Sequence, residues 1–346
     1  MAKRRERTPD SYAKAGVDIK REDKAVRGIV NWVSRTFKFR EGKAGQVMKD
    51  VGTFANVIDL GSYALAMCTD GVGSKVLIAQ ELDKYDTVGI DLVAMNVNDL
   101  ICIGAEPIAM VDYLAMETTD ERVARDISAG LYEGARQAQV AIVGGETASL
   151  PDIIKGCAPG KGFDLAGTAV GIVAKDKIIT GEKIAVGDVV LAFDSSGIHS
   201  NGLTLARKVL PKSMWLSLLT PTRIYVQEVL ELLPKFDIHG IANITGGGVL
   251  NLVRLTKHGF LFDRLPDPQL IFKKIQEFGK ISDNEMYKTF NMGMGLCIIA
   301  SRSQADKILA EYGKKFRIME VGRVVEDSGV RIVKEGKEIS IERDMY

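Results

Sequence analysis

The sequence of 346 residues lacks the features that define several protein classes. It has only four cysteines, with no C-x-x-C pair and no metal-ligand spacing, which argues against a cysteine zinc site. We expect all of them to be small buried residues of a reduced protein; they are Cys68, Cys102, Cys157 and Cys297. No apolar run approaches the roughly 18 residues that a membrane-spanning helix needs. The segment 1–16 also lacks the apolar block of a signal peptide. We therefore predict a cytoplasmic protein with no membrane partner.

The chain also lacks an excess of charge and is poor in aromatic residues. Its 46 Lys and Arg residues balance 45 Asp and Glu residues, and only 7% of residues are aromatic. A nucleic-acid-binding module would need a basic face with interleaved aromatic residues. The basic cluster Lys3, Arg4, Arg5 and Arg7 favours such a module, but a solvated terminus explains it better. We expect no nucleic-acid partner.

Length and apolar content indicate a globular chain of about two domains. From residue 62 onward, strand-like and helix-like segments alternate, and the cycle restarts after a polar stretch near residues 172–182. We place the domains at 1–172 and 173–346. In the first, we expect strands at 63–70, 107–116, 140–147 and 163–173, and helices at 86–105 and 118–139. In the second, we expect strand, turn and helix over 189–210, a helix over 220–234, and strand, glycine turn and helix over 238–259. The same alternation continues over 294–325.

Four segments share one design, in which a strand ends and small polar residues lead to a helix or turn. They are "TDGVGSK" (69–75), "GGETASLP" (144–151), "SSGIHSNG" (195–202) and "TGGGV" (245–249). Backbone amides in such turns bind anions, and glycine allows a ligand to approach the backbone closely. One such turn is common after a strand. Four of them, interleaved with acids, favour a phosphate-binding site.

The acids near these turns are Asp70, Asp99 and Glu146, with Asp91 and Asn98 on the helix that carries Asp99. Carboxylates beside phosphate-binding turns suit Mg²⁺, a hard cation that takes oxygen ligands. Alternatively, Asp70 and Glu146 cap helices and Asp91 faces solvent. For Asp91 alone we favour solvent exposure. For Asp70, Asp99 and Glu146 together we favour metal–nucleotide binding.

Two further side chains are candidates for contact with a ligand. Lys75 is either a phosphate partner or a surface lysine at a helix start, and the sequence leaves both open. His199 lies among small polar residues, which favours a ligand contact over core packing. His239 and His258 flank apolar segments and carry no such signal. Because the chain lacks the P-loop, the G-x-G-x-x-G motif and the kinase loops, any ATP would bind through an uncommon fold.

These motifs, in this order, resemble those of the aminoimidazole ribonucleotide synthetase family over nearly the whole chain. The longest of them are the most specific. The matching segments are "SYAKAGVDI" (11–19), "TDGVGSK", "GIDLVAMNVNDL" (89–100), "GAEP" (104–107), "GGETASLP", "SSGIHSNG", "PTRIYVQEVLELL" (221–233), "ITGGG" (244–248) and "EMYKTFNMGMG" (285–295).

The resemblance implies an α+β fold. Its N-terminal domain would have a mixed or antiparallel sheet that pairs across a homodimer into a barrel, and its C-terminal domain would be α/β. It implies ATP-dependent ring closure of formylglycinamidine ribonucleotide through an iminophosphate. Mg²⁺ would be held by Asp70, Asp99 and Glu146, and catalysis would involve Lys75, His199 and Asn291. Besides Asp70, the residues implied for binding nucleotide or substrate are Gly71, Gly73, Gly144, Gly145, Thr147, Ser196, Gly197, Ser200, Asn201, Thr245, Gly246 and Gly247.

The sequence departs from bacterial members of that family at three places. The segment 48–58 replaces a glycine-rich stretch, Asn243 replaces a histidine, and the segment 210–223 is shorter. The ligand contacts that the glycine-rich stretch makes in bacterial members therefore cannot be assigned to segment 48–58. A catalytic histidine cannot be assigned to position 243. Sister activities are disfavoured. Selenophosphate synthetase would need a reactive cysteine near the N-terminus, and thiamine monophosphate kinase would need consecutive aspartates where "CTDGVGSK" (68–75) has one.

Overall fold

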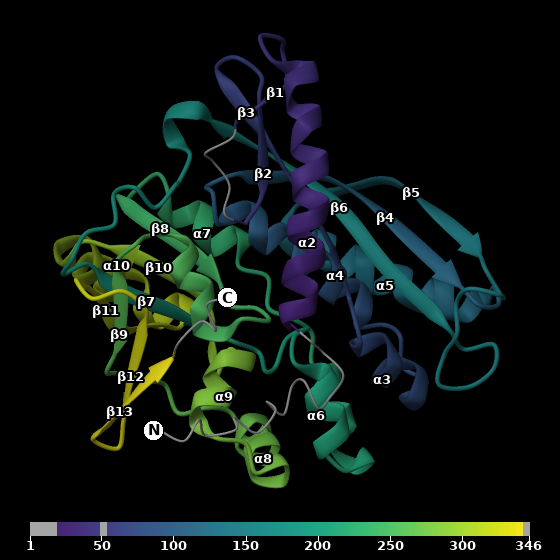
Figure 1. The fold of residues 1–346 in the computed structure, drawn as a ribbon. Coiled ribbons are helices and arrows are strands. Elements are labelled where there is room, and N and C mark those ends of the chain that lie inside the picture. Colours follow the sequence, from purple (N-terminus) through teal and green to yellow (C-terminus); the bar gives the residue numbers. More distant parts are fainter. Residues whose placement is uncertain (1–18, 49–53, 342–346) are drawn as a thin grey trace, which may run out of the picture.

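A computed structural model of the chain describes residues 19–48 and 54–341, and Figure 1 shows two sheets lying side by side with helices around them. The basic cluster at residues 3–7, most of "SYAKAGVDI" and residues 49–53 lie outside the described residues. The elements of the first half are α2 (Ile19–Val33), η1 (Ser34–Arg40), β1 (Gln46–Val47), β2 (Asn56–Asp59), β3 (Tyr63–Gly71), α3 (Lys75–Leu82), α4 (Val88–Ile101), β4 (Glu106–Met116), α5 (Glu121–Ala138), β5 (Ala141–Ser149) and β6 (Phe163–Ala174).

The first sheet is mixed, as predicted, with the strand order β1-β2-β3-β6-β4-β5. Its neighbouring strands are antiparallel except β4 and β5, which are parallel. Alternate side chains of β3, including Ala64, Ala66 and Cys68, are buried under α4, which also packs against α5. The opposite face of this sheet carries exposed apolar side chains, among them Tyr63, Val111 and Tyr113.

The second sheet has the strand order β13-β12-β9-β11-β7-β10-β8 and is antiparallel except for β12 with β9. Every residue of β10 is buried, which agrees with its unbroken apolar sequence "MGLCIIA". Its strands are β7 (Val189–Asp194), β8 (Ile238–Asn243), β9 (Gly259–Phe262), β10 (Met294–Ala300), β11 (Ile318–Val325), β12 (Val330–Lys334) and β13 (Lys337–Ile341). Its helices are α6 (Leu203–Val209), η3 (Lys212–Leu219), α7 (Val226–Leu232), η4 (Gly248–Arg254), α8 (Leu270–Gly279), α9 (Asp283–Thr289) and α10 (Arg302–Phe316).

The first sheet ends with β6 at Ala174, and the second begins with β7 at Val189 after the short helix η2 (Lys175–Lys177). The boundary at 172/173 stays a prediction, and β6 crosses it by two residues. Helix α4 links the halves, since it packs on the first sheet and also contacts α7 and β8. None of the helices in the described ranges is long and apolar enough to cross a membrane.

Three predictions about local structure were wrong. The strand expected at 140–147 continues to Ser149, so the segment "GGETAS" pairs with β4 and does not form the turn expected over 144–151. The helix expected over 220–234 begins only at Val226, since the backbone before it is hydrogen-bonded to α4 side chains. Cys157 is exposed, while the other cysteines are buried as expected.

Candidate functional site

The candidate site lies where one edge of the second sheet meets β3 and α4. Because β10 is antiparallel to both β7 and β8, the end of β7, the end of β8 and the start of β10 lie at the same edge. The loop 195–202, the glycine turn 245–248 and the segment 291–293 all leave the sheet there. The structure therefore brings together three of the sequence motifs.

Asp70 and Asp99 approach each other from β3 and α4. Burial raises the pKa of Asp99 to about 7, and the nearby charge of Asp70 adds to the rise, while a hydrogen bond from Asn243 opposes it. Asn243 Nδ2 donates to Asp99 Oδ1 at 2.9 Å, so β8 of the second half orients an acid of the first. Burial also raises the pKa of Asp70, whose Oδ1 accepts a bond from the Gly71 amide at 2.7 Å. Two desolvated carboxylates thus face one small region.

Glu146 does not join this pair within one chain, and its predicted place in the metal site stays a prediction. It lies exposed on the edge strand β5, and three strand spacings, roughly 14 Å, separate β5 from β3. It also points to the other face of the sheet. Glu146 pairs in register with Tyr113, whereas Asp70 lies in the same row as Asp112, and successive residues of a strand point to opposite faces. Among the described residues, no group of three or more His, Cys, Asp or Glu side chains could hold a metal. The neighbouring Gly144, Gly145 and Thr147 are exposed on the same strand.

Asp112 is an acid that our sequence interpretation missed. Asp70 on β3 and Asp112 on β4 are both in register with Gly167 on β6, which lies between them, so both acids lie on the face that α4 covers. Burial raises its pKa. The alternation of "PIAMVDYLAM" contains the signal, since Asp112 has the same parity as the buried Met110 and Leu114.

Lys75 and Asp91 form a fully buried ion pair between α3 and α4. Lys75 Nζ lies 2.9 Å from Asp91 Oδ1 and 2.8 Å from Oδ2, and neither side chain is exposed to solvent. Burial lowers the pKa of Lys75, and the charge of Asp91 opposes that shift. The expectation that Asp91 faces solvent was therefore wrong, as was the alternative of a surface position for Lys75.

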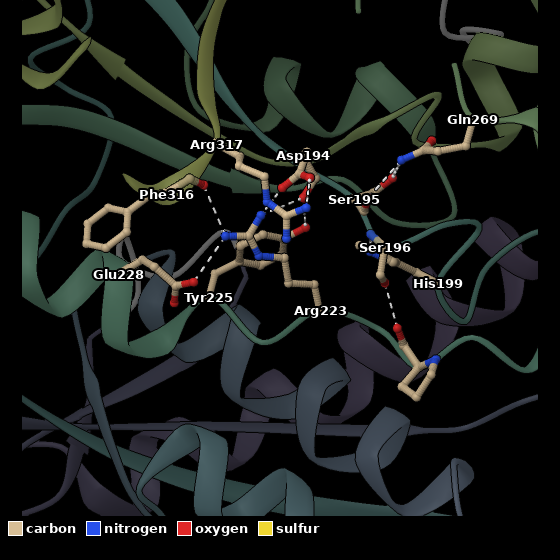
Figure 2. Close-up of polar contacts among 11 residues, drawn as sticks. Asp194, Ser195, Ser196, His199, Arg223, Tyr225, Glu228, Gln269, Phe316 and Arg317 are labelled. Atoms are coloured by element: carbon tan, nitrogen blue, oxygen red, sulfur yellow. Dashed lines mark hydrogen bonds and ion pairs between the residues drawn. The ribbon is translucent and has the colours of Figure 1, made fainter. Parts of the chain in front are cut away.

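His199 is also buried, in the loop 195–202. Burial lowers the pKa of His199 to about 3, with a further contribution from the charge of Lys75, so the imidazole is neutral. Its Nε2 accepts a bond from the Ser196 amide at 3.3 Å, and its ring lies near that of Tyr225. Figure 2 shows Ser196 and His199 side by side beside Ser195. This arrangement fits a side chain that shapes the loop; the predicted ligand contact stays a prediction.

A second group of side chains fixes the end of β7 (Figure 2). Arg223 forms an ion pair with Asp194 and donates to Glu228 and to the Phe316 carbonyl, each at 3.1 Å. Arg317 lies 3.2 Å from the second oxygen of Asp194. A cavity of about 270 Å³ lies beside these residues, also lined by Ile90 and Gln137 of the first half. Both arginines that line it form ion pairs with Asp194.

Contacts with neighbouring backbone fix the positions of Asn291 and of the glycine turn 245–248. Asn291 is buried, and its Nδ2 donates to the Gly197 carbonyl at 2.9 Å, which ties the start of β10 to the loop 195–202. A Cβ atom on Gly248 would lie 1.9 Å from the Tyr287 carbonyl oxygen, so only glycine fits there. The predicted ligand-binding positions differ in access. Gly73, Ser196 and Gly246 are exposed, whereas Gly71, Ser200, Asn201, Thr245 and Gly247 are half-buried and Gly197 is buried.

Comparison with known proteins identifies the family. The N-terminal domain of AIR synthase related proteins matches residues 52–173, and their C-terminal domain matches residues 185–335. The chain belongs to the AIR synthase related family. It is 50% identical to the phosphoribosylformylglycinamidine cyclo-ligase of Thermococcus kodakarensis over 93% of this chain and 97% of that protein. It is 48% identical to the protein of that name from Methanosarcina barkeri, over 93% and 96%. Relatives at this identity make the chain an enzyme of the cyclo-ligase class.

Solved structures of the same fold are far less similar in sequence. The ThiL protein complexed with AMPPCP and TMP has a TM-score of 0.65 at 17% identity, covering 90% of this chain and 94% of that one. The hydrogenase maturation protein HypE in complex with ATP has a TM-score of 0.61 at 18% identity, covering 82% and 85%. These likenesses support the fold alone.

Proposed function

We propose that this chain closes the ring of formylglycinamidine ribonucleotide with ATP, giving aminoimidazole ribonucleotide, ADP and phosphate. The observation that carries the proposal is the pair of desolvated carboxylates, Asp70 and Asp99, with Asp99 bonded to Asn243 at the end of β8. The exposed turns at Ser196 and Gly246 leave the second sheet at that same end. Family membership and the name of the relatives at about 50% identity support the substrate and product.

The residues present fit Mg²⁺ at Asp70 and Asp99. The pKa of Asp99 is raised because its negative charge is desolvated and close to that of Asp70, and a divalent cation would relieve both effects. Carboxylate oxygens are the ligands that Mg²⁺ prefers. Bound there, the ion would neutralise the charge of the triphosphate. Asn243 holds Asp99 Oδ1 and leaves the other oxygen of that carboxylate for the ion.

ATP is needed because an amide-type oxygen leaves poorly. We infer that the formyl oxygen attacks the γ-phosphorus of ATP, so that ADP departs and an iminophosphate forms. The ring-forming nitrogen then attacks the activated carbon, loses a proton, and phosphate leaves with the former formyl oxygen. The chain's own part is to position these groups, and proximity could contribute about 7 kcal/mol or more. The amides of the exposed Gly246 and the half-buried Gly247 are suited to hold phosphate oxygens of the ribonucleotide, since the Ser196 and Thr245 amides already donate to His199 and Asn251.

We also propose that the enzyme is a homodimer that pairs through the open face of the first sheet. That face carries Tyr63, Val111 and Tyr113 at 53%, 42% and 39% exposure. An apolar sheet face of this kind favours a partner surface. Glu146 lies on this face, so it would be close to a second subunit. The predicted role of Glu146 in the metal site can then be met only across such an interface.

The experiment that tests the function mixes purified protein with Mg²⁺, ATP and formylglycinamidine ribonucleotide, and follows the diazotisable aminoimidazole product. Parallel reactions with thiamine monophosphate or selenide in place of the ribonucleotide test the sister activities. The proposal expects product only with the ribonucleotide. Phosphorylation of thiamine monophosphate without ring closure would contradict it.

A further inference from the structure

The buried ion pair of Lys75 and Asp91 joins the two halves of the molecule at the site. Lys75 Nζ donates to the Thr220 carbonyl at 2.7 Å and to the His199 carbonyl at 3.3 Å, both in the second half. Asp91 Oδ1 accepts from the Thr222 amide at 2.8 Å and from its hydroxyl at 2.6 Å. Each member of the pair, which comes from α3 and α4, therefore holds backbone of the other half.

The two stretches that the pair holds are also joined to each other. Ser196 Oγ donates to the Pro221 carbonyl at 2.6 Å, and Ser200 Oγ lies 3.3 Å from Thr222 Oγ1. The segment 220–225 is therefore a strap that runs between α4 and the loop 195–202. Asn98, two turns further along α4, fixes the far end of the strap through the Arg223 carbonyl at 2.8 Å and the Tyr225 amide at 3.0 Å.

The hydrogen bonds of Lys75 leave little capacity for a ligand. An ammonium group has three donors, and Asp91 Oδ1, the Thr220 carbonyl and the His199 carbonyl accept one each. A phosphate contact would need Lys75 to leave at least one buried acceptor unsatisfied. Stability alone also gives weak reason for such a pair, because apolar residues of similar volume often replace a buried ion pair without loss.

Lys75 is connected to the metal side as well. It follows Asp70 by five residues, and the turn 71–74 lies between them. Ser74 Oγ in that turn accepts a hydrogen bond from Thr204 Oγ1, in α6 just after the loop 195–202, at 3.0 Å. The turn 71–74 thus connects Asp70, on the proposed metal side, to the end of the loop 195–202, on the proposed substrate side.

We propose that Lys75 and Asp91 are positioning residues that hold the loop 195–202 and the strap 220–225 in register with Asp70, and that Lys75 is not a phosphate ligand. The pair makes one site from two half-sites on different sheets. The identity of the ligand that the loop holds rests on the proposed function; the positioning itself does not.

The test compares the full-length protein with two variants by hydrogen–deuterium exchange of its peptides. Lys75→Met combined with Asp91→Leu removes the pair with apolar side chains of similar size. Thr222→Val removes a single hydroxyl and keeps the test open if the double variant does not fold. The matched control is Lys84→Met with Asp86→Leu, because this pair is similar in distance, at 2.8 Å, but exposed.

In both test variants we expect exchange in peptides 195–202 and 220–225 to rise about tenfold or more, while the β3 peptide stays unchanged. Steady-state kinetics should show the KM for the ribonucleotide rising about tenfold, with the affinity for a non-hydrolysable ATP analogue changed less than about threefold. The control should match the wild type in all three measurements.

Unchanged exchange in the loop and strap of a folded variant would overturn the proposal. Loss of ATP-analogue binding with unchanged exchange would overturn it in favour of a phosphate contact by Lys75. If the wild type closes no ring but the variants still loosen the loop, the proposed function fails and the positioning role stands.

Discussion

The two sheets of the molecule differ in how completely this chain covers them. In the second sheet, β10 is buried along its whole length, and β7 and β8 are nearly so; α10 packs against β7 and β10, while α4 of the first half packs against β8. In the first sheet, α4 and α5 cover one face, and the other presents exposed side chains such as Tyr63 and Tyr113. The second half therefore buries its sheet more completely, while the first half has a surface suited to a partner and carries the acids of the site.

This difference predicts where a substitution affects chemistry, assembly or stability. A change in the acids of the first half should remove activity while leaving the fold intact. A change on its open face should alter assembly. A change in the second sheet should reduce stability, whatever the ligand or partner.

The largest expected effect is on activity. Asp99→Asn should lower Mg²⁺-dependent turnover by roughly a thousandfold or more, because it removes a charge that would face the proposed cation. The ring-closure assay and circular dichroism together measure this effect. Asp86→Asn is the control, since Asp86 forms only an exposed ion pair with Lys84. Near-wild-type turnover of the Asp99 variant would remove that residue from the metal site.

The next effect is on assembly. Tyr113→Asp should convert a dimer to a monomer, since it places a charge among the exposed apolar side chains of the open sheet face. Sedimentation or light scattering gives the mass directly. Phe278→Asp, at an exposed apolar position of α8 in the second half, should leave the mass unchanged. A wild-type protein that is already monomeric would contradict the proposed interface.

In the second sheet, Ile298→Ala should lower the free energy of unfolding by about 2–5 kcal/mol, because Ile298 is fully buried in the centre of β10. Urea unfolding measures the change. The destabilisation should not depend on protein concentration, as long as the oligomeric state stays the same over the range used. A loss below about 1 kcal/mol would show that this sheet tolerates cavities better than its burial suggests.

The smallest effect concerns pH. The pKa of His199 is about 3 in the folded chain and about 6.5 when unfolded, so the unfolded state binds more protons between these values. Stability should therefore fall as pH falls, by about 2 kcal/mol between pH 7 and pH 5 from this group. His199→Asn, which tolerates the positive φ of 60° at this position, should lack that component. His258→Asn is the control, and an equal pH slope in wild type and the His199 variant would contradict the assignment.

The sequence by itself determined the elements and the kind of chemistry. Alternating and continuous apolar patterns located β3, α4, β4, α5, β6, β7 and β10, because burial on one face or two leaves a periodic signature. The order of glycine turns and acids pointed to the family and to Asp70 and Asp99.

Only the tertiary structure decided which of these residues meet. Strand order separated Glu146 from Asp70, and register placed it on the opposite face, neither of which a linear pattern encodes. The extended strap at 220–225, which has a helical pattern in the sequence, is fixed by bonds from Asp91 and Asn98. Lys75 and His199 have polar neighbours in the sequence but lie in the interior, because they meet where the two halves pack together and Lys75 Nζ donates to the His199 carbonyl.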